Sequence, residues 1–194
     1  MGDEFLKVGL FGGSFNPPHV CHTLATLWAL QTGGLDQVWW MPTYQHAFGK
    51  DLVSFEDRVR MCQMATSDLR RVEICEIERE LGGESRTIDT VQALTARNPN
   101  HRYTLIIGTD ILAERHKWKN WDGLMELVDL LVIGRTGHLE HDDLPDATQF
   151  ALPQVSSTAI RAALAAGGDS PLLSDWMVQG VLEFVRQRGF YKNA

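Results

Sequence analysis

A short apolar run at residues 8–11 ends in two adjacent glycines, Gly12 and Gly13, and this junction constrains the fold more than any other stretch of the chain. The run predicts a buried strand, and the glycines predict a tight turn, because glycine accepts backbone angles and close approaches that other residues do not. A helical pattern follows at residues 19–32 and ends at a second glycine pair. The first turn of such a helix has free amide N–H groups, which together with the helix dipole form an anion site, most naturally for phosphate.

Two histidines, His19 and His22, stand in the first turn of this predicted helix. Their i, i+3 spacing places both side chains on one face, where they reach the same anion. A metal pair is the alternative interpretation, but a zinc site needs further Cys, His or carboxylate ligands, and none nearby in the sequence completes one. We therefore expect a phosphate site and no protein-held metal.

Strand and helix patterns alternate along the chain. We expect strands at residues 7–11, 37–41, 72–77, 103–107, 130–133 and 149–152, and helices at 19–32, 55–65, 87–96, 123–127, 157–166 and 174–188. This alternation predicts βαβ units and an α/β fold with a Rossmann-like, doubly wound parallel sheet. No repeat or long linker divides the sequence, so we expect residues 1–194 to form a single domain. Ligands in such folds bind beyond the carboxyl ends of the strands, where Gly12, Pro42 and Gly108 fall.

Four blocks of the sequence resemble the HxGH nucleotidyltransferase superfamily. Residues 12–22, GGSFNPPHVCH, resemble its first signature, and residues 155–161, VSSTAIR, resemble its second, ATP-binding signature. Residues 85–90, SRTIDT, and 107–110, IGTD, followed by Trp118, resemble the nicotinate-mononucleotide adenylyltransferases in particular. The blocks occur in the family's order and cover nearly the whole chain, so the resemblance implies the nucleotidyltransferase type of Rossmann-like fold.

This resemblance implies adenylyl transfer in NAD biosynthesis. The 5′-phosphate of nicotinate mononucleotide would attack the α-phosphorus of ATP, expel pyrophosphate and form nicotinate adenine dinucleotide. The nucleophile is already anionic, so catalysis requires positioning and charge neutralisation, and Mg²⁺ would arrive with ATP on few or no protein ligands. Two alternatives stay open: the same chemistry on nicotinamide mononucleotide or another phosphorylated acceptor such as phosphopantetheine, and a non-catalytic nucleotide-binding homologue.

The resemblance also implies three groups of site residues. The catalytic group is His19, His22 and Arg161, with His22 on the α-phosphate. Contacts to ATP are expected from both signatures, from the loop after the second strand and from the end of the fourth strand: Gly12, Gly13, Ser14, Phe15, His19, His22, Lys50, Gly108, Asp110, Ser156, Ser157, Thr158 and Arg161. The acceptor is expected at Asn16, Thr87 and Trp118, because a flat tryptophan face suits a pyridine ring.

Other roles are open for several of these residues. Lys50, near His46, is as readily a solvated loop lysine as a phosphate ligand. Asp110 resembles the family aspartate that binds the adenosine ribose, and it also fits an N-cap for a helix that begins near Ile111. For Trp118, the alternative interpretation is ordinary packing in the core.

Packing is the preferred interpretation for the remaining aromatic and polar clusters. Trp121 is expected to pack locally, and Trp39, Trp40 and Trp176 are expected in the core or at a subunit contact, so a homo-oligomer is allowed. A further cluster has the composition of a metal site, but a polar loop is the better interpretation: it comprises His138, His141, Asp142 and Asp143.

The sequence departs from the family pattern at Cys21, at Arg86 and in the proline-rich spacing around Lys50. Cys21 replaces the glycine between the histidines, where a small thiol either points aside, weakens ATP binding or forms a reactive thiolate at the helix N-terminus. Arg86 replaces the aromatic residue that precedes Thr87, and its charge would favour an acidic acceptor if the side chain turns inward.

Charge, cysteine content and the N-terminal sequence indicate which partners and which compartment to expect. The net charge of −7 and the isoelectric point near 5.4 argue against a nucleic-acid polymer or an acidic membrane as partner. An odd number of cysteines without paired spacing indicates reduced thiols, and the acidic N-terminus lacks the apolar run of a signal peptide. No segment is apolar over the length needed to span a bilayer. We expect a cytoplasmic protein whose partners are ATP and a pyridine mononucleotide.

Overall fold

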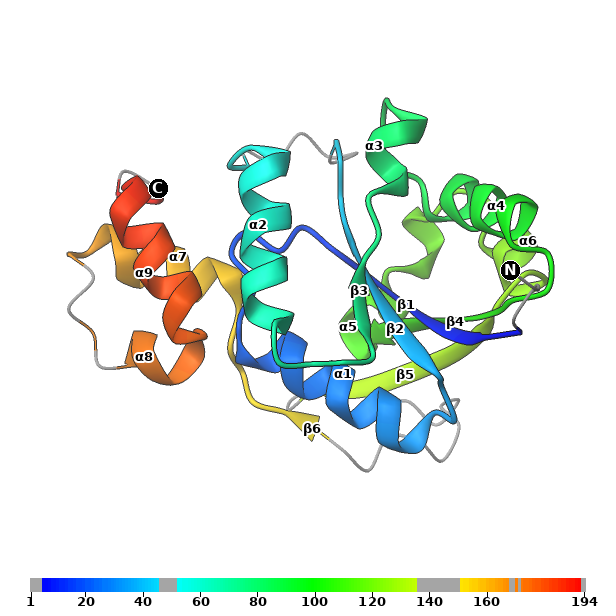
Figure 1. Ribbon diagram of the computed structural model, residues 1–194, viewed down its shortest axis with the longest axis horizontal. Helices are drawn as coiled ribbons and strands as arrows, with labels where there is room; N and C mark the ends of the chain where they lie inside the picture. Colours follow the sequence, from blue (N-terminus) through cyan, green and yellow to red (C-terminus); the bar gives the residue numbers. More distant parts are fainter. Residues whose placement is uncertain (1–4, 46–51, 136–150, 168–169, 171, 193–194) are drawn as a thin grey trace.

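One parallel sheet organises the computed structural model, which describes residues 5–45, 52–135, 151–167, 170 and 172–192 (Figure 1). Its strands are β1 (Lys7–Gly13), β2 (Gln37–Pro42), β3 (Val72–Ile74), β4 (Arg102–Gly108), β5 (Asp129–Arg135) and β6 (Ala151–Leu152). The strands lie in the order β3-β2-β1-β4-β5-β6, and every adjacent pair is parallel. The chain reverses its direction of winding between β1 and β4, which confirms the predicted Rossmann-like fold and places a ligand crevice at this point.

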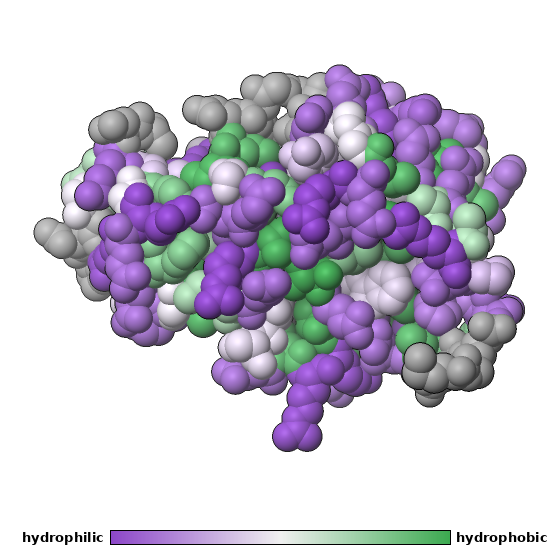
Figure 2. Space-filling view, turned by 45° about the horizontal axis from the view of Figure 1, so that its top comes forward, coloured by the Kyte–Doolittle hydropathy of each residue, from purple (hydrophilic) through white to green (hydrophobic). Residues whose placement is uncertain are grey.

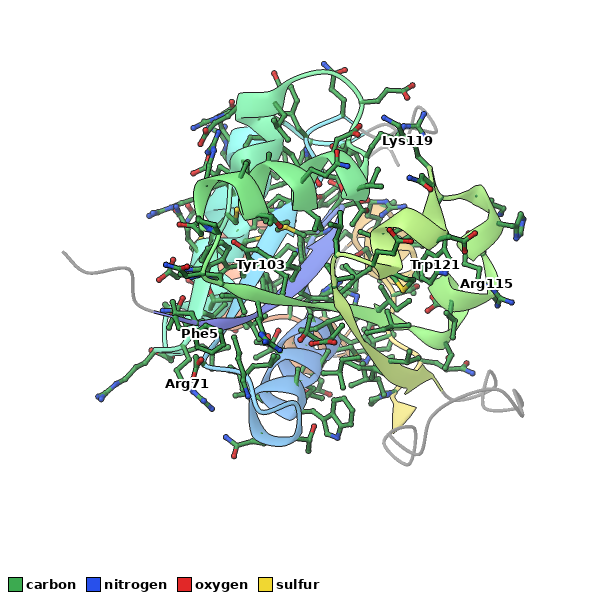
Figure 3. The ribbon with its side chains drawn as sticks, turned by 90° about the vertical axis from the view of Figure 1, so that its right-hand side faces the viewer. Phe5, Arg71, Tyr103, Arg115, Lys119 and Trp121 are labelled. Carbon is green, nitrogen blue, oxygen red and sulfur yellow. The ribbon has the colours of Figure 1, made fainter. Side chains whose placement is uncertain are left out.

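Helices cover both faces of the sheet. They are α1 (Val20–Thr32), α2 (Phe55–Thr66), α3 (Ile77–Leu81), α4 (Thr87–Arg97), α5 (Thr109–Ala113), α6 (Trp121–Met125), α7 (Ser157–Ala165), α8 (Leu172–Trp176) and α9 (Gln179–Arg188), with a 3₁₀ turn, η1 (Arg115–Lys117). Figure 3 shows the strands between α1 on one side and α4 on the other. Figure 1 shows α7, α8 and α9 grouped beside α2, at one end of the molecule.

Alternate strand residues supply two separate cores. Trp40 and Ile106 are buried on the face that packs against α1 and the C-terminal helices. Leu10, Met41 and Leu105 are buried on the opposite face, against α4 and α6. Successive side chains of a strand point to opposite faces, so strands covered on both sides show nearly continuous apolar runs. This burial explains why the strand pattern could be recognised in the sequence.

Four local predictions were wrong. The tight turn expected at Gly12 and Gly13 is not there, because both glycines continue β1, pair with β2 and have no positive φ. The strand expected at 72–77 ends at Ile74, and Ile77–Leu81 forms α3 instead. The helix expected at 174–188 is two helices, because Val178 takes an extended backbone (φ −59°, ψ 134°) while Met177 before it is buried. Asp110 is not an N-cap, since α5 already begins at Thr109 and Gly108 occupies the cap position. In the described ranges, no helix is long and apolar enough to cross a membrane.

Candidate active site

The loop after β1 leads into α1 and brings the two histidines together. His19 is the N-cap of α1, and its backbone N–H donates to Nδ1 of His22 over 3.0 Å. The two rings lie 3.8 Å apart between centroids. Because Nδ1 of His22 accepts a hydrogen bond, the neutral ring carries its proton on Nε2 and can donate it to an anion. The predicted pairing of the histidines on one turn is therefore present.

Aromatic packing holds this loop in a strained conformation. Phe15 has a positive φ of 46°, which is costly for a residue with a side chain. Its ring is 1% exposed and stacks on Trp40 at 4.7 Å between centroids, with an interplanar angle of 5°. Phe11 packs edge-on against Phe15 at 6.0 Å. The buried stack offsets the backbone strain and holds the loop against Trp40 of β2.

A cavity of about 430 Å³ opens where these elements meet, a volume typical of sites for small molecules. It brings together many of the predicted site residues: Gly12, Gly13, Ser14, His19, His22, Thr87, Gly108, Asp110 and Trp118. Apolar residues such as Met41 and Ile107 complete its wall. Figure 2 shows apolar residues reaching the surface between hydrophilic ones in the middle of one face.

Two predicted ligand residues of the first signature are used inside the protein. Phe15 belongs to the buried stack, and Asn16 is 2% exposed. The Asn16 side-chain oxygen accepts from the hydroxyl of Tyr191 at 2.7 Å and from the backbone N–H of Val53 at 3.3 Å. Neither residue lines the cavity, and the hydrogen bonds of Asn16 brace the loop. Lys50 and His46 lie outside the described residues, as do the polar residues predicted at 138–143.

The second signature sits against the first. Ser156 is the N-cap of α7 and accepts from the backbone N–H of Ala159 at 3.2 Å. Ser157 donates its hydroxyl to the carbonyl of Pro17 at 2.9 Å. Arg161 donates to the carbonyl of Asn16 at 2.9 Å. The two signatures, far apart in the sequence, therefore form one connected unit beside the cavity.

The part of the cavity lined by Trp118, Lys119 and Arg86 carries paired charges. Trp118 is half-buried and packs edge-on against Trp121, at 5.6 Å between centroids. Lys119 forms an ion pair with Asp89 at 2.9 Å. Arg86, whose charge we expected to bear on the acceptor, lines the cavity but pairs with Glu84. The ion pair reduces the positive charge that Arg86 presents to a ligand.

Cys21 turns away from the backbone that it would crowd. The thiol is 2% exposed and donates to the carbonyl of Pro153 at 3.5 Å. It belongs to the same buried apolar cluster as Ala25 and Val155. Cys21 thus packs α1 against the segment before α7, as the first of the three alternatives expected.

Sequence reasoning missed two buried charged residues at the site: Arg58, which does not line the cavity, and Glu78, which does. Their exposed fractions are 1% and 8%. Burial lowers the pKa of the Arg58 guanidinium and raises the pKa of the Glu78 carboxyl. Both lie in stretches of mixed charge that are typical of a solvated helix face, so the local sequence gave no signal of their burial.

The family comparison agrees with this geometry. Residues 10–163 match the family model described as cytidylyltransferase-like. A protein of Anaeromyxobacter sp. (strain K), named a probable nicotinate-nucleotide adenylyltransferase, is 45% identical over 189 residues, which are 96% of this chain and 97% of its own. A Myxococcus xanthus protein of the same name is 39% identical and covers 96% and 95%.

Solved structures show the same fold. The nicotinic acid mononucleotide adenylyltransferase of Plasmodium falciparum, complexed with NaAD, has a TM-score of 0.82 at 14% identity and covers 97% of this chain and 98% of its own. A putative nicotinate-nucleotide adenylyltransferase of Vibrio parahaemolyticus has a TM-score of 0.71 at 21% identity, with 97% of each chain covered. Fold, site and family model together define a nucleotidyltransferase of the cytidylyltransferase-like class. Within that class, the chain belongs to the nicotinate-nucleotide adenylyltransferase family.

Proposed function

We infer that this protein transfers the adenylyl group of ATP to nicotinate mononucleotide, and so forms nicotinate adenine dinucleotide and pyrophosphate in NAD biosynthesis. One observation carries the inference: a single cavity is lined both by the histidine loop and by Thr87 and Trp118. The reaction joins two nucleotides, so its site must hold a triphosphate and a flat heteroaromatic ring together. Relatives that match nearly the whole chain bear the name of this activity.

The histidine loop is proposed to bind the phosphates of ATP. The Nε2–H of His22 would donate to the α-phosphate as negative charge develops there, and His19 would support it from the same turn. Donors that are held in place before the reaction are worth most, because they need no reorganisation in the transition state. The bracing of the loop by the Phe15 stack and by Asn16 supplies this preorganisation.

Further ATP contacts are proposed at the end of β1, at the junction of β4 and α5, and at the start of α7. We propose that Gly12, Gly13 and Ser14 approach the phosphates, and that Gly108 and Asp110 bind the adenosine. At the second signature, the amides and hydroxyls at the start of α7 and the guanidinium of Arg161 would hold the terminal phosphates; the residues are Ser156, Ser157, Thr158 and Arg161. Lys50 remains a proposed phosphate ligand outside the described ranges.

Magnesium is proposed to enter with ATP. The part of the chain that the structure describes has no group of three or more His, Cys, Asp or Glu side chains arranged to hold a metal ion. Mg²⁺ coordinates phosphate oxygens and retains several waters, so a nucleotide-bound ion needs few protein ligands. It would neutralise charge on the phosphates, while His22 and Arg161 orient them.

The nicotinate ring is proposed to stack on Trp118, with its carboxylate at the start of α4. Thr87 is the first residue of that helix, and no side chain caps the helix at Arg86. The free N–H groups of a first turn favour a carboxylate over an uncharged amide. This preference selects the acid form of the mononucleotide over the amide form.

Compartment and assembly follow as further proposals. All three cysteines are free thiols in the described structure, which suits a reducing cytoplasm. The partners would be ATP and the pyridine mononucleotide, and a homo-oligomer is compatible with the half-buried Trp39 and Trp176.

The test is pyrophosphate release from ATP with a panel of acceptors, together with mass analysis of the product. We expect kcat/KM to be at least about tenfold higher for nicotinate than for nicotinamide mononucleotide, which is about 1.4 kcal/mol, and no turnover with phosphopantetheine. Equal rates with acid and amide would refute the choice of acceptor and leave adenylyl transfer standing. Absence of pyrophosphate with every acceptor, from a protein that binds ATP, would favour the non-catalytic alternative.

A further inference from the structure

Two buried charges tie together the loops that form the proposed site. Arg58, on α2, donates from Nη1 to the carbonyl of Ser14 at 3.0 Å, in the loop after β1. Its Nε donates to the carbonyl of Val53 at 3.1 Å, and its Nη2 lies 3.5 Å from the carbonyl of Tyr44, in the loop after β2. One planar guanidinium thus joins three backbone segments, which a single-point ammonium could not reach at once.

Glu78, on α3, extends this connection to the acceptor side. Its carboxylate accepts from the backbone N–H of Tyr44 at 3.1 Å. The Ser85 hydroxyl also accepts from the N–H of Tyr44 at 3.0 Å, and the Ser85 N–H donates to the carbonyl of Gln45 at 3.0 Å. Ser85 lies two residues before Thr87, the first residue of α4. Glu78 and Ser85 themselves line the cavity.

Stability alone gives a poor account of this arrangement. Removing two charges from water is expensive, and apolar residues of similar volume are often at least as stable in such places. The cost is evident in the two groups, since burial moves the pKa of each toward its neutral form. Arg58 donates to the loop that carries Ser14, and Glu78 accepts from Tyr44, whose N–H also donates to Ser85. These bonds connect the ATP side and the acceptor side of one cavity.

We propose that Arg58 and Glu78 are positioning residues, which set the distance between the phosphate loop after β1 and the acceptor loop before α4. Neither residue takes part in bond making. Arg58 fixes the phosphate loop at Ser14. Glu78 fixes Tyr44, whose N–H also donates to Ser85 in the acceptor loop. The proposal rests on the proposed adenylyl transfer, because only a reaction between two bound substrates requires these loops at a fixed separation.

The test compares Arg58→Lys with a matched control, Arg71→Lys. Arg71 also donates to two backbone carbonyls, those of Leu35 at 3.2 Å and Leu30 at 3.3 Å. Figure 3 shows Arg71 at the lower left, away from Lys119 at the upper right. Both substitutions keep the charge and lose the planar fork. Because Arg58 is buried and Arg71 is exposed, a merely structural role predicts a larger loss of Tm for Arg58→Lys but a near-normal kcat/KM in the folded protein.

We expect Arg58→Lys to lower kcat/KM by about 100-fold, the usual cost of misplacing reacting groups by about 1 Å, with most of the loss in kcat. Arg71→Lys should stay within about twofold of wild type. Glu78→Gln, a milder change, should raise the KM for the acceptor about tenfold or more and leave the KM for ATP within about twofold. The reason is that a neutral amide oxygen is a weaker acceptor for the N–H of Tyr44 than a carboxylate, which loosens the link to the acceptor loop.

Each result separates the proposal from the underlying function. If wild type releases no pyrophosphate, the proposed function fails before the variants are compared. If wild type is active and folded Arg58→Lys has the same kcat/KM as Arg71→Lys, the positioning role is overturned. Should Arg58→Lys not fold, Glu78→Gln decides: equal changes in both KM values, or no change, would overturn the proposal.

Discussion

The hydrogen bond from Tyr191 to Asn16 connects the C-terminal segment with the phosphate loop, and Tyr191→Phe removes it alone. The hydroxyl lies 2.7 Å from the Asn16 side-chain oxygen, which keeps a second, longer bond of 3.3 Å from the N–H of Val53. Burial raises the pKa of the Tyr191 hydroxyl, so it is a neutral donor at neutral pH. Loss of one such bond costs about 1 kcal/mol of unfolding free energy, because the buried acceptor still has a partner. For a chain of this size, this lowers Tm by about 2–4 °C.

Tyr191→Phe should lower kcat/KM by more than its small loss of unfolding free energy would suggest. Asn16 precedes the two prolines that lead into α1, so a shift of its side chain moves His19 and His22 with it. A displacement of a fraction of an ångström corresponds to a loss of about tenfold in kcat/KM, against about 100-fold for a full ångström. The assay is pyrophosphate release at saturating and limiting ATP, with Tm measured by calorimetry on the same samples.

Tyr103→Phe is the matched control. Its hydroxyl donates to the carbonyl of Leu94 at 3.1 Å, on the far side of the sheet from α7, and the residue is 3% exposed. Both substitutions remove one buried hydroxyl, so both should lower Tm, and only Tyr191→Phe should lower kcat/KM. If both variants keep wild-type kcat/KM, the bond between Tyr191 and Asn16 has no part in positioning the loop.

Four further changes test the site. His22→Ala should lower kcat by about 10²–10³ with little effect on Tm, as for other transition-state donors; near-normal turnover would remove His22 from the mechanism. Arg161→Lys should raise the KM for ATP and lower kcat, because the planar fork is lost although the charge remains; an unchanged KM for ATP would show that Arg161 only braces the loop. Trp118→Ala should lower kcat/KM for nicotinate and nicotinamide mononucleotide alike, since stacking does not distinguish acid from amide, and loss for one acceptor only would contradict the stacking role. The last change is in pH. Burial raises the pKa of the Glu78 carboxyl above its ordinary value of 4.5, so the folded state binds this proton more tightly than the unfolded state. The wild type therefore loses unfolding free energy as the pH rises from 4.5 through the folded pKa. Urea titrations should therefore show the unfolding free energy of wild type, relative to Glu78→Gln, increasing as the pH is lowered; a constant or decreasing difference contradicts the shift.

The elements predicted best are those that hydrophobic burial determines. β1 was predicted closely because a strand covered on both faces has a nearly continuous apolar run, and α1 because the glycine pair after it marks its end. The break at Met177 was missed, because a helical pattern continues through it and only packing against neighbouring helices favours the turn. The same limit applies to α3, where an apolar Ile77 after a strand is compatible with either structure. Local pattern gives the type of an element more reliably than its end.

Part of the predicted site comes together in the structure. Nine of the residues assigned from the resemblance line one cavity, whereas Phe15, Asn16 and the four residues of the second signature do not. The side-chain oxygen of Asn16, which was assigned to the acceptor, is bonded to Tyr191 and Val53. A motif records which residues are required and does not distinguish contact with a ligand from support of the residues that make it. Arg58 and Glu78 were missed for the converse reason, since they belong to no motif and are defined only by the backbone groups they meet in the fold.

Arg161 shows that the two kinds of role can coincide in one side chain. Two of its N–H groups donate to the carbonyl of Asn16 and the hydroxyl of Thr158. A guanidinium carries more donors than these two, so the remaining ones can reach a phosphate without releasing the loop. A phosphate bound there would meet a cation whose orientation is already fixed by the first signature. Binding of ATP at the second signature and the placement of His19 and His22 are then coupled through one residue, which is why a change at Arg161 should alter both KM and kcat.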